Sequence, residues 1–463
     1  MARTQHFAVQ AKMPIYSVGF VQDDIIVYSG GGGAGRSGVT NAVVAARIDL
    51  ASQSIDKLDE CSLSRDEDAP MAMAINSAKS QLVCGINSTA DRVKSGSNQP
   101  IRIFDYAISP QADNASSSQS EKPSTSAKVQ LSLASASSSL HIQDPEEYVK
   151  VVSFSPDGRM LAVASTDGQV SLHRYPSLSP VWNDVREPSS SAIAAAEAKD
   201  TSISLASHDF DKAEIYDADF SHSNTHLVLT SSSKLVVYAT DPFADPDSDA
   251  ASTNGDAASA PAEGYAQTIQ TIKNPALGGK GPCSFRAARF GRGEASKEKL
   301  FTVVNAAPAG GKGPKAKIRK SFVTAWDADT WDLIETRHVS DRPVTVFDVS
   351  ADGKFLAYGA SDLSVGVLDA KTLRPVLKIL HAHDFPPTCL KFNPASNLLV
   401  SASADNTLRI IPIPAKALLE SAARSSGALA FIAETRMGFY TTIFLSLLIA
   451  ALALWFQRQY LLN

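Results

Sequence analysis

The sequence lacks the residue patterns that mark metal enzymes, redox proteins and nucleic-acid binders. It has four cysteines in 463 residues, and they form neither a Cys-x-x-Cys pair nor a zinc spacing. Its nine histidines show no metal spacing, and the chain has no arrangement typical of a hydrolase. The formal net charge of −5 argues against a nucleic-acid partner, because such proteins are usually basic. Scattered cysteines without a disulfide framework indicate a reducing compartment.

Residues 1–12 are polar and contain no apolar core, so we expect no signal peptide. Residues 437–456, by contrast, form a run of 20 residues without a charge. As a helix this run would cross about 30 Å of hydrocarbon, and it is apolar on all sides. More basic residues precede it than follow it, which places the large N-terminal part in the cytosol. We predict a single-pass anchor with a juxtamembrane linker at 413–436 and a lumenal tail at 457–463, in a thin membrane such as that of the endoplasmic reticulum (ER).

A strand and turn pattern recurs along the rest of the chain. Val151–Leu172 alternates apolar and polar residues around Pro-Asp-Gly and Thr-Asp-Gly turns, and the pattern returns at Val344–Asp362 and Thr388–Ile410. It resembles the WD-repeat family, in which each repeat of about 40–45 residues forms a four-stranded propeller blade. We therefore predict an all-β, seven-bladed propeller over residues 1–412, with Gln5–Ala11 completing the last blade. The predicted blades are 15–49, 70–105, 148–175, 212–240, 284–330, 343–370 and 386–412.

Three segments between the predicted blades are too polar to be buried. They are rich in serine, alanine, aspartate and proline and have few aromatic residues. Such composition cannot bury enough apolar surface to offset the entropy of ordering, so we expect these inserts to be disordered. They are residues 107–147, 184–210 and 241–282.

The most unusual segment is a glycine run, in which six of the nine residues from Gly30 to Gly38 are glycine. Glycine destabilises regular elements by about 0.5–1 kcal/mol relative to alanine, so the run needs another reason. A dinucleotide site would use the G-x-G-x-x-G match in it but lacks a surrounding βαβ unit, and the Gly-Lys-Ser/Thr of a P-loop is absent. Glycine amides with Arg36 could bind an anion. Backbone carbonyls could bind a monovalent cation such as potassium, because residues 29–41 contain no Asp or Glu. A loop without a ligand also remains open.

The propeller, the C-terminal anchor and a glycine run ending in Gly38-Val39-Thr40-Asn41 occur together in this chain. This combination resembles the ER-membrane guanine nucleotide exchange factors for Sar-family small GTPases, which start assembly of the COPII vesicle coat. The resemblance implies a regulatory exchange factor rather than an enzyme of covalent chemistry. Its implied partners are a Sar-type GTPase and the ER membrane, with no nucleic acid and no small-molecule substrate. The alternative is a non-catalytic WD-repeat adaptor anchored in the ER membrane.

The resemblance also implies roles for residues of the glycine run. Asn41 matches the key polar residue of that family, Val39 matches an apolar contact position, and Thr40 stands where some members carry proline. These three are the expected catalytic residues. A potassium ion is expected on backbone carbonyls of a subset of Gly30, Gly31, Gly32, Gly33, Gly35 and Gly38.

Overall fold

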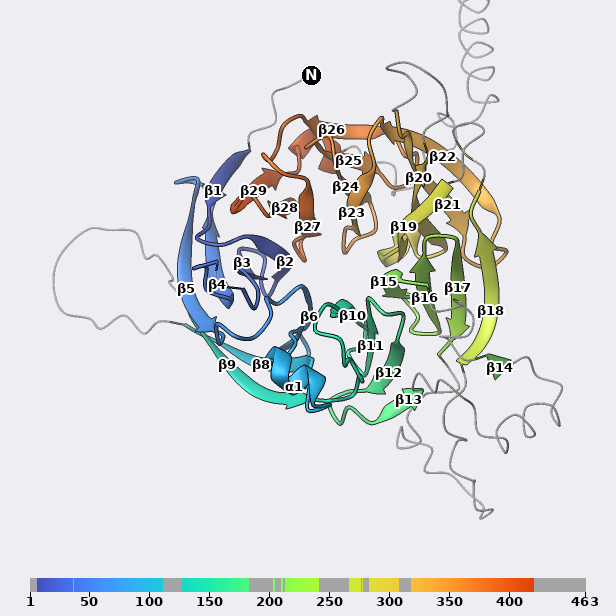
Figure 1. Ribbon diagram of the computed structural model, residues 1–463. Coiled ribbons are helices and arrows are strands. Elements are labelled where there is room, and N and C mark those ends of the chain that lie inside the picture. Colours follow the sequence, from blue (N-terminus) through green and yellow to red (C-terminus); the bar gives the residue numbers. More distant parts are fainter. Residues whose placement is uncertain are drawn as a thin grey trace, which may run out of the picture. The chain divides into compact units, whose positions relative to one another are not determined.

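The computed structural model describes residues 6–35, 37–110, 127–182, 203–204, 210, 213–240, 266–275, 277, 283–307 and 318–419. The chain divides into two units, Met1–Pro412 and Ile413–Asn463. In the first unit seven antiparallel sheets stand side by side around a ring (Figure 1), which confirms the predicted seven-bladed propeller.

Each sheet is one blade, and its strands follow one another from the centre of the ring outward. Blade 1 contains β2 (Ile15–Phe20), β3 (Ile25–Gly30), β4 (Ala42–Asp49) and β5 (Ser54–Ser62). Blade 2 contains β6 (Ala72–Asn76), β7 (Gln81–Gly85), β8 (Ile101–Pro110) and β9 (Ala127–Ser137), with helix α1 (Ala90–Lys94) between β7 and β8. Blade 3 contains β10 (Val149–Phe154), β11 (Met160–Ser165), β12 (Val170–Arg174) and β13 (Pro180–Trp182).

The remaining blades follow the same plan. Blade 4 contains β15 (Ile215–Phe220), β16 (His226–Ser231), β17 (Lys234–Ala239) and β18 (Ala266–Lys273), and β14 (Ile203–Ser204) pairs outside β18. Blade 5 contains β19 (Cys283–Phe290), α4 (Gly293–Ser296), β20 (Lys299–Ala306), β21 (Ser321–Asp327) and β22 (Leu333–Ser340). Blade 6 contains β23 (Val344–Val349), β24 (Phe355–Ala360), β25 (Val365–Asp369) and β26 (Pro375–Ile379). Blade 7 contains β27 (Pro387–Phe392), β28 (Leu398–Ser403) and β29 (Thr407–Pro412).

The ring closes by pairing the two ends of the first unit. Strand β1 (Phe7–Gln10) lies antiparallel to β29, with Phe7 opposite Ile410 and Gln10 opposite Thr407. This pairing gives blade 7 its fourth strand, as the sequence predicted for Gln5–Ala11. A closed ring protects the sheet edges that would otherwise template aggregation.

Apolar side chains from facing blades form the core between them. In the cluster between blades 3 and 4, for example, Phe220 and Tyr238 are fully buried against Leu172 and Ala162. Burial of such side chains contributes about 25 cal/mol per Å² of apolar surface. Successive side chains of a strand point to opposite faces, so strands such as β11, which is buried at every residue, contact the blade on each side.

The outer strands correct the sequence analysis. Residues 107–147 were predicted to be a disordered insert, but β8 runs to Pro110 and β9 pairs with its whole length. The inserts predicted at 184–210 and 241–282 likewise contain β14 and β18. An outer strand buries only one face, so β9 needs only alternating apolar residues such as Val129 and Leu131. Its composition is therefore polar although both of its ends and its middle pair with β8 along one edge.

No helix in the part of the chain that the structure describes is long and apolar enough to cross a membrane. The predicted span at 437–456 and the tail at 457–463 lie outside the described residues, and the predicted linker is described only to residue 419.

Candidate functional site

The glycine loop, residues 29–41, joins β3 to β4 in blade 1. Its first glycines are required by close packing. A Cβ at Gly30 would lie 1.9 Å from the carbonyl oxygen of Pro14, and one at Gly32 would lie 1.8 Å from Ser37 Oγ. Gly31 has a φ of +144°, and its amide donates to the Pro14 carbonyl at 3.0 Å. The run therefore lets the loop lie directly against the start of blade 1 and fold back on itself.

Asn41 holds this loop in shape through its side-chain amide. Its Oδ1 accepts from the Gly33 N–H at 2.9 Å, and its Nδ2 donates to the Gly33 carbonyl at 3.2 Å. The same Nδ2 donates to the Glu67 carbonyl at 2.8 Å, and the residue is only 1% exposed. In this structure Asn41 thus connects the loop to the segment that links blade 1 to blade 2, a role that the sequence analysis did not assign.

A buried ion pair supports that linking segment. Glu67 Oε1 lies 2.7 Å from Arg102 Nη2, and both side chains are largely buried. Arg102 also donates from Nε to the Gln99 carbonyl at 2.8 Å and from Nη2 to Ser88 Oγ at 3.2 Å. A buried guanidinium with several acceptors is a directional anchor, because its donors lie in a fixed plane. Arg102 of blade 2 therefore holds Glu67 in place, and the Glu67 carbonyl accepts from Asn41.

The carboxylate of Asp68, in the same segment, contacts the loop directly. Asp68 accepts hydrogen bonds from the Ala34 amide and from the Asn87 side chain. Burial raises the pKa of Asp68 above its usual value, and these two hydrogen bonds partly offset the increase. The side chain of Asn87 also donates to the Glu147 carbonyl of the segment before blade 3 at 2.7 Å. We call Glu67, Asp68, Asn87 and Arg102 the platform of the glycine loop. Its contacts extend across blade 2 to the segment before blade 3.

The outer half of the loop is more open. Gly35 and Gly38 are exposed, and no atom lies within 4 Å of a Cβ built on either one. Thr40 is exposed, whereas Val39 is half-buried against the core shared by blades 1 and 7. Gly38, Val39 and Thr40 also border a cavity of about 430 Å³ between these blades. Arg36 lies outside the described residues.

The loop offers neutral oxygen atoms rather than a charged metal cluster. Among the described residues, no group of three or more His, Cys, Asp or Glu side chains could hold a metal ion. The Gly33 carbonyl is occupied by Asn41 and the Gly32 carbonyl lies at the start of a turn, but the carbonyl oxygens of Gly31 and Gly35 accept no hydrogen bond from any described residue. Such oxygens are free to take water, a cation or a partner's donor.

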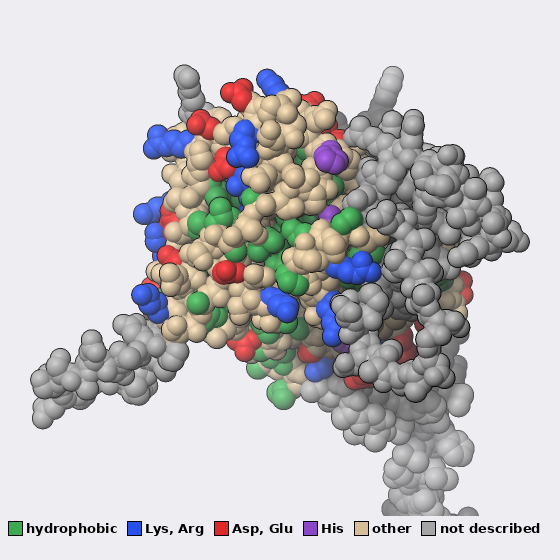
Figure 2. All heavy atoms as spheres, turned by 90° about the horizontal axis from the view of Figure 1, so that it is seen from below, with side chains coloured by type: hydrophobic (Ala, Val, Ile, Leu, Met, Phe, Trp, Pro, Cys, Tyr) green, Lys and Arg blue, Asp and Glu red, His purple; other side chains and the backbone are tan. Residues whose placement is uncertain are grey.

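The surface around the propeller carries both signs of charge. Figure 2 shows Lys and Arg side chains interspersed with Asp and Glu on the described part of one side, without a continuous basic patch. This distribution agrees with the net charge of −5, and that side has no basic surface of the kind that binds nucleic acid.

Comparison with known proteins identifies the repeats and the relatives. The family described as WD domain, G-beta repeat, matches residues 137–174 and 374–411. The solved structure of Chaetomium thermophilum Raptor superposes with a TM-score of 0.54 and 12% identity over 89% of this chain and 29% of the Raptor chain. That likeness shows the propeller fold alone.

The relatives in sequence are more specific. SEC12-like protein 2 of Arabidopsis thaliana is 23% identical over 385 residues, which are 82% of this chain and 74% of the relative. Guanine nucleotide-exchange factor SEC12 of Candida glabrata is 23% identical over 415 residues, with 87% and 71% covered. The protein of the same name from Mus musculus is 23% identical over 410 residues, with 83% and 82% covered. The resemblance stated from the glycine run and the blades is therefore confirmed, and the chain is similar over most of its length to SEC12-type guanine nucleotide-exchange factors.

The sequence analysis found the loop but not its platform. Glu67, Asp68 and Arg102 were not singled out, because they lie 26 to 61 positions beyond Asn41 and belong to no local motif. One signal was available. An arginine at the second position of the apolar strand Ile101–Tyr106 must be paired if that strand is buried.

Proposed function

We propose that this chain is a guanine nucleotide exchange factor that releases GDP from a Sar-type small GTPase at the ER membrane and so starts COPII vesicle formation. Two observations support the proposal. The relatives that align with most of the chain are named guanine nucleotide-exchange factors. The described part of blade 1 also carries a glycine loop that is tied down at its base and exposed at Gly35, Gly38 and Thr40.

The proposed mechanism is regulatory and needs no covalent step. A factor that binds the nucleotide-free GTPase more tightly than the nucleotide-bound form must weaken nucleotide binding to the same extent. Each tenfold acceleration of release corresponds to about 1.4 kcal/mol of barrier. Ordering a loop during binding would consume part of this free energy. Asn41 and its platform hold the loop before contact, and the exposed residues after Gly33 then meet the nucleotide site of the GTPase.

We also propose that a potassium ion orders the loop. The donor set fits a monovalent cation, because it consists of neutral carbonyl oxygens and residues 29–41 contain no carboxylate. The carbonyls of Gly31 and Gly35 are the favoured ligands, since no described residue donates to them, whereas Gly33 is held by Asn41. When bound, the ion would supply only charge and order, and the contacts with the GTPase would still be made by the chain.

The membrane part of the proposal depends on the sequence. We propose that residues 437–456 anchor the chain in the ER membrane with the propeller in the cytosol and residues 457–463 in the lumen. The run of 20 residues without a charge and the excess of basic residues before it support this orientation. A Sar-type GTPase activated by the propeller would then be charged with GTP at the membrane surface.

Nucleotide release tests the proposal directly. A Sar-type GTPase loaded with fluorescent GDP is mixed with the full-length chain in potassium buffer and, separately, in sodium buffer of equal ionic strength. We expect accelerated release in potassium and a slower rate in sodium. No acceleration in either buffer would reject exchange activity and favour the adaptor, whereas equal acceleration in both would reject only the potassium ion.

A further inference from the structure

The inner strands of six of the seven blades share an irregularity near their first residues. In each case the strand pairing skips one residue, which is the signature of a β-bulge. A bulge redirects a side chain, and all six bulged residues line the central cavity of the ring. They are Tyr16, Lys150, Tyr216, Arg286, Thr345 and Thr388.

The ring of bulged residues lies on the face that carries the glycine loop. Ile15, next to the bulged Tyr16, pairs with Gly30, where the glycine loop begins. The other five bulges likewise lie where the start of an inner strand meets the end of the second strand. The inner strands of adjacent blades run in the same direction, because Asp217 and Asp219 accept from the amides of Ala288 and Phe290 in that order.

Five of the six bulged residues, all except Tyr16, fall into two groups. Thr345 and Thr388 bond back to the backbone, since Thr345 Oγ1 donates to the Pro387 carbonyl at 2.8 Å and Thr388 Oγ1 donates to the Ile15 carbonyl at 2.5 Å. On blades 3, 4 and 5 the bulged residues instead gather around one ring. Lys150 Nζ lies 4.4 Å, and Arg286 Cζ 5.4 Å, from the centroid of the Tyr216 ring.

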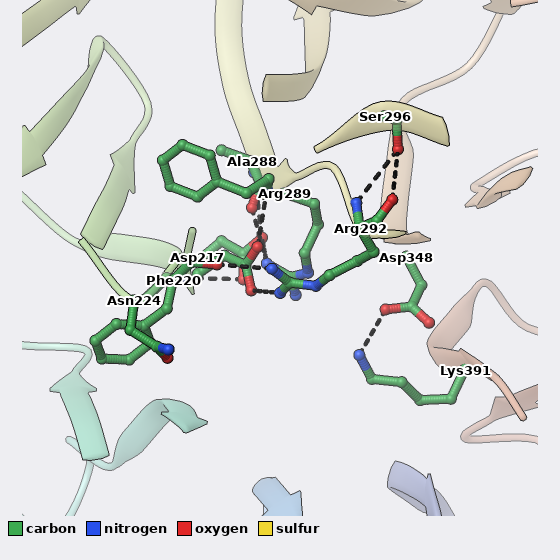
Figure 3. A network of polar contacts seen from close by, with 12 residues as sticks. Asp217, Phe220, Asn224, Ala288, Arg289, Arg292, Ser296, Asp348 and Lys391 are labelled. Carbon is green, nitrogen blue, oxygen red and sulfur yellow. Dashed lines mark hydrogen bonds and ion pairs between the residues drawn. The ribbon is translucent and has the colours of Figure 1, made fainter. Parts of the chain in front are cut away.

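Other charges that line the cavity are neutralised in pairs. Arg289 is paired with Asp217, Arg292 Nη2 lies 2.6 Å from Asp219 Oδ1, and Lys391 Nζ lies 2.6 Å from Asp348 Oδ1. Figure 3 shows Asp217, Arg289 and Arg292 close together and the Asp348–Lys391 pair beside them. These pairs join blade 4 to blade 5 and blade 6 to blade 7, and they leave no net charge.

The charges around Tyr216 are not balanced in this way. Lys150 is paired with Glu214, but no described carboxylate forms an ion pair with Arg286. Burial lowers the pKa of Lys150, and the nearby positive charge of Arg286 lowers it further, against the effect of Glu214. The hydroxyl of Tyr148 lies within the electrostatic reach of Glu214, Arg286 and Glu147.

We propose that this end of the central cavity, between Lys150, Tyr216 and Arg286, is a binding site for the phosphoryl group of a small organic phosphate. Arg286 supplies planar paired donors and a positive charge that forms no ion pair with a described carboxylate, and Lys150 supplies a second cation. The phenolic hydroxyls of Tyr148 and Tyr216 are additional donors that no described residue accepts from.

The size of the cavity and the kind of donors favour this ligand class. The cavity measures about 910 Å³, and small-molecule sites usually have about 300–1,000 Å³. Five basic and three acidic side chains line it. A phosphoryl group presents three acceptor oxygens, which suits donors that converge from blades 3, 4 and 5. The groups lie inside the ring of blades, so a soluble molecule fits better than the headgroup of a lipid in a bilayer.

Calorimetric titration of the full-length chain with glycerol 3-phosphate tests the proposal. We expect saturable binding that weakens at least tenfold in Arg286→Gln and less in Arg286→Lys, which keeps the charge. Arg374→Gln is the matched control, because Arg374 is exposed on the turn between β25 and β26 and does not line the cavity. Its affinity should equal that of the original chain.

A second measurement needs no variant and so does not depend on folding of Arg286→Gln. Phenylglyoxal modifies accessible arginines, and glycerol 3-phosphate should protect Arg286 but not Arg374 when the peptides are quantified by mass spectrometry. Absence of saturable binding, equal affinity in Arg286→Gln, or equal protection of both arginines would each overturn the proposal. None of these readouts uses GDP release, so they are independent of the exchange activity proposed above.

Discussion

Replacing Asn41 by alanine should disable the glycine loop while the propeller stays folded. The substitution removes three hydrogen bonds, two with Gly33 and one with the Glu67 carbonyl. We call the loop conformation that Asn41 stabilises the held form. A typical hydrogen bond contributes about 1 kcal/mol net, so the held form should lose about 3 kcal/mol of stability relative to other loop conformations. Exchange that requires the held form would then fall by up to about 10²-fold, because about 1.4 kcal/mol corresponds to a factor of ten.

The matched control is Asn305→Ala in blade 5. The Asn305 side chain also makes three hydrogen bonds, donating to the Val344 carbonyl at 3.0 Å and accepting from Ser321 Oγ at 2.7 Å and the Val344 amide at 3.0 Å. Both variants should therefore lose similar unfolding free energy in urea. Only Asn41→Ala should slow GDP release from a Sar-type GTPase.

The result that refutes this reasoning is specific. If Asn41→Ala releases GDP at a rate within twofold of the original chain, the hydrogen bonds between Asn41 and Gly33 do not determine the active conformation of the loop. If Asn305→Ala slows exchange as much as Asn41→Ala at temperatures where both are folded, the effect is general destabilisation. Hydrogen exchange of the Gly33 amide, which Asn41 Oδ1 accepts from at 2.9 Å, reports that hydrogen bond directly.

Three further predictions follow from the same contacts and from one buried histidine. Arg102→Met leaves the Glu67 carboxylate buried without its cation, and should cost about 3–5 kcal/mol in urea unfolding. Gly31→Ala would place a Cβ 2.2 Å from Asn41 Oδ1 and should abolish the acceleration of GDP release. A Cβ at Gly35 has no atom within 4 Å, so Gly35→Ala should release GDP as the original chain does. Burial lowers the pKa of His383 from about 6.5 to about 4. Between these pH values His383 is protonated in the unfolded chain but neutral in the folded chain. The contribution of His383 to the unfolding free energy should fall by about 3 kcal/mol as pH drops through that window, and acid titration in urea, compared with His383→Gln, measures it.

Each of these predictions has its own control. Adding Glu67→Gln to Arg102→Met removes the unpaired Glu67 carboxylate and should recover part of the lost unfolding free energy. If the losses of the two single variants simply add in the double variant, the two side chains do not interact directly. Equal exchange by Gly31→Ala and Gly35→Ala would show that close packing at Gly31 is dispensable. His383→Gln should remove one proton from the pH dependence while His173, whose pKa is also lowered to about 4 by burial, keeps its own contribution. An unchanged pH profile in His383→Gln would rule out this assignment.

The inner strands of the blades could be predicted from the sequence because their signal is local. Val151–Leu172 alternates apolar and polar residues around turns in which Asp157 and Asp167 accept from backbone amides two residues later. That pattern predicts the strands and the turns between them. Outer strands such as β9 were missed because one of their faces meets water, where serine and lysine are as suitable as valine.

The candidate site was predictable in location but not in construction. Six glycines in nine residues mark a loop whose backbone must pass close to something, and Gly31 and Gly32 meet Asn41 and Ser37. The contacts of Asn41 with Glu67, and of Glu67 with Arg102, join segments 26 and 35 positions apart. Such separations carry no periodic signal in a single chain, because they depend on how blades 1 and 2 pack.

The platform of the glycine loop makes its shape depend on the packing of two blades. Arg102 belongs to the third strand of blade 2, yet through Glu67 it fixes the carbonyl to which Asn41 donates. Substitutions at the boundary of blades 1 and 2 should therefore change exchange and stability together, whereas substitutions of equal cost in blade 5 should change stability alone. Arg102→Met and Asn305→Ala separate the two cases at matched urea concentrations. Proportional loss of exchange in both variants would mean that the loop depends on the whole ring rather than on its own platform.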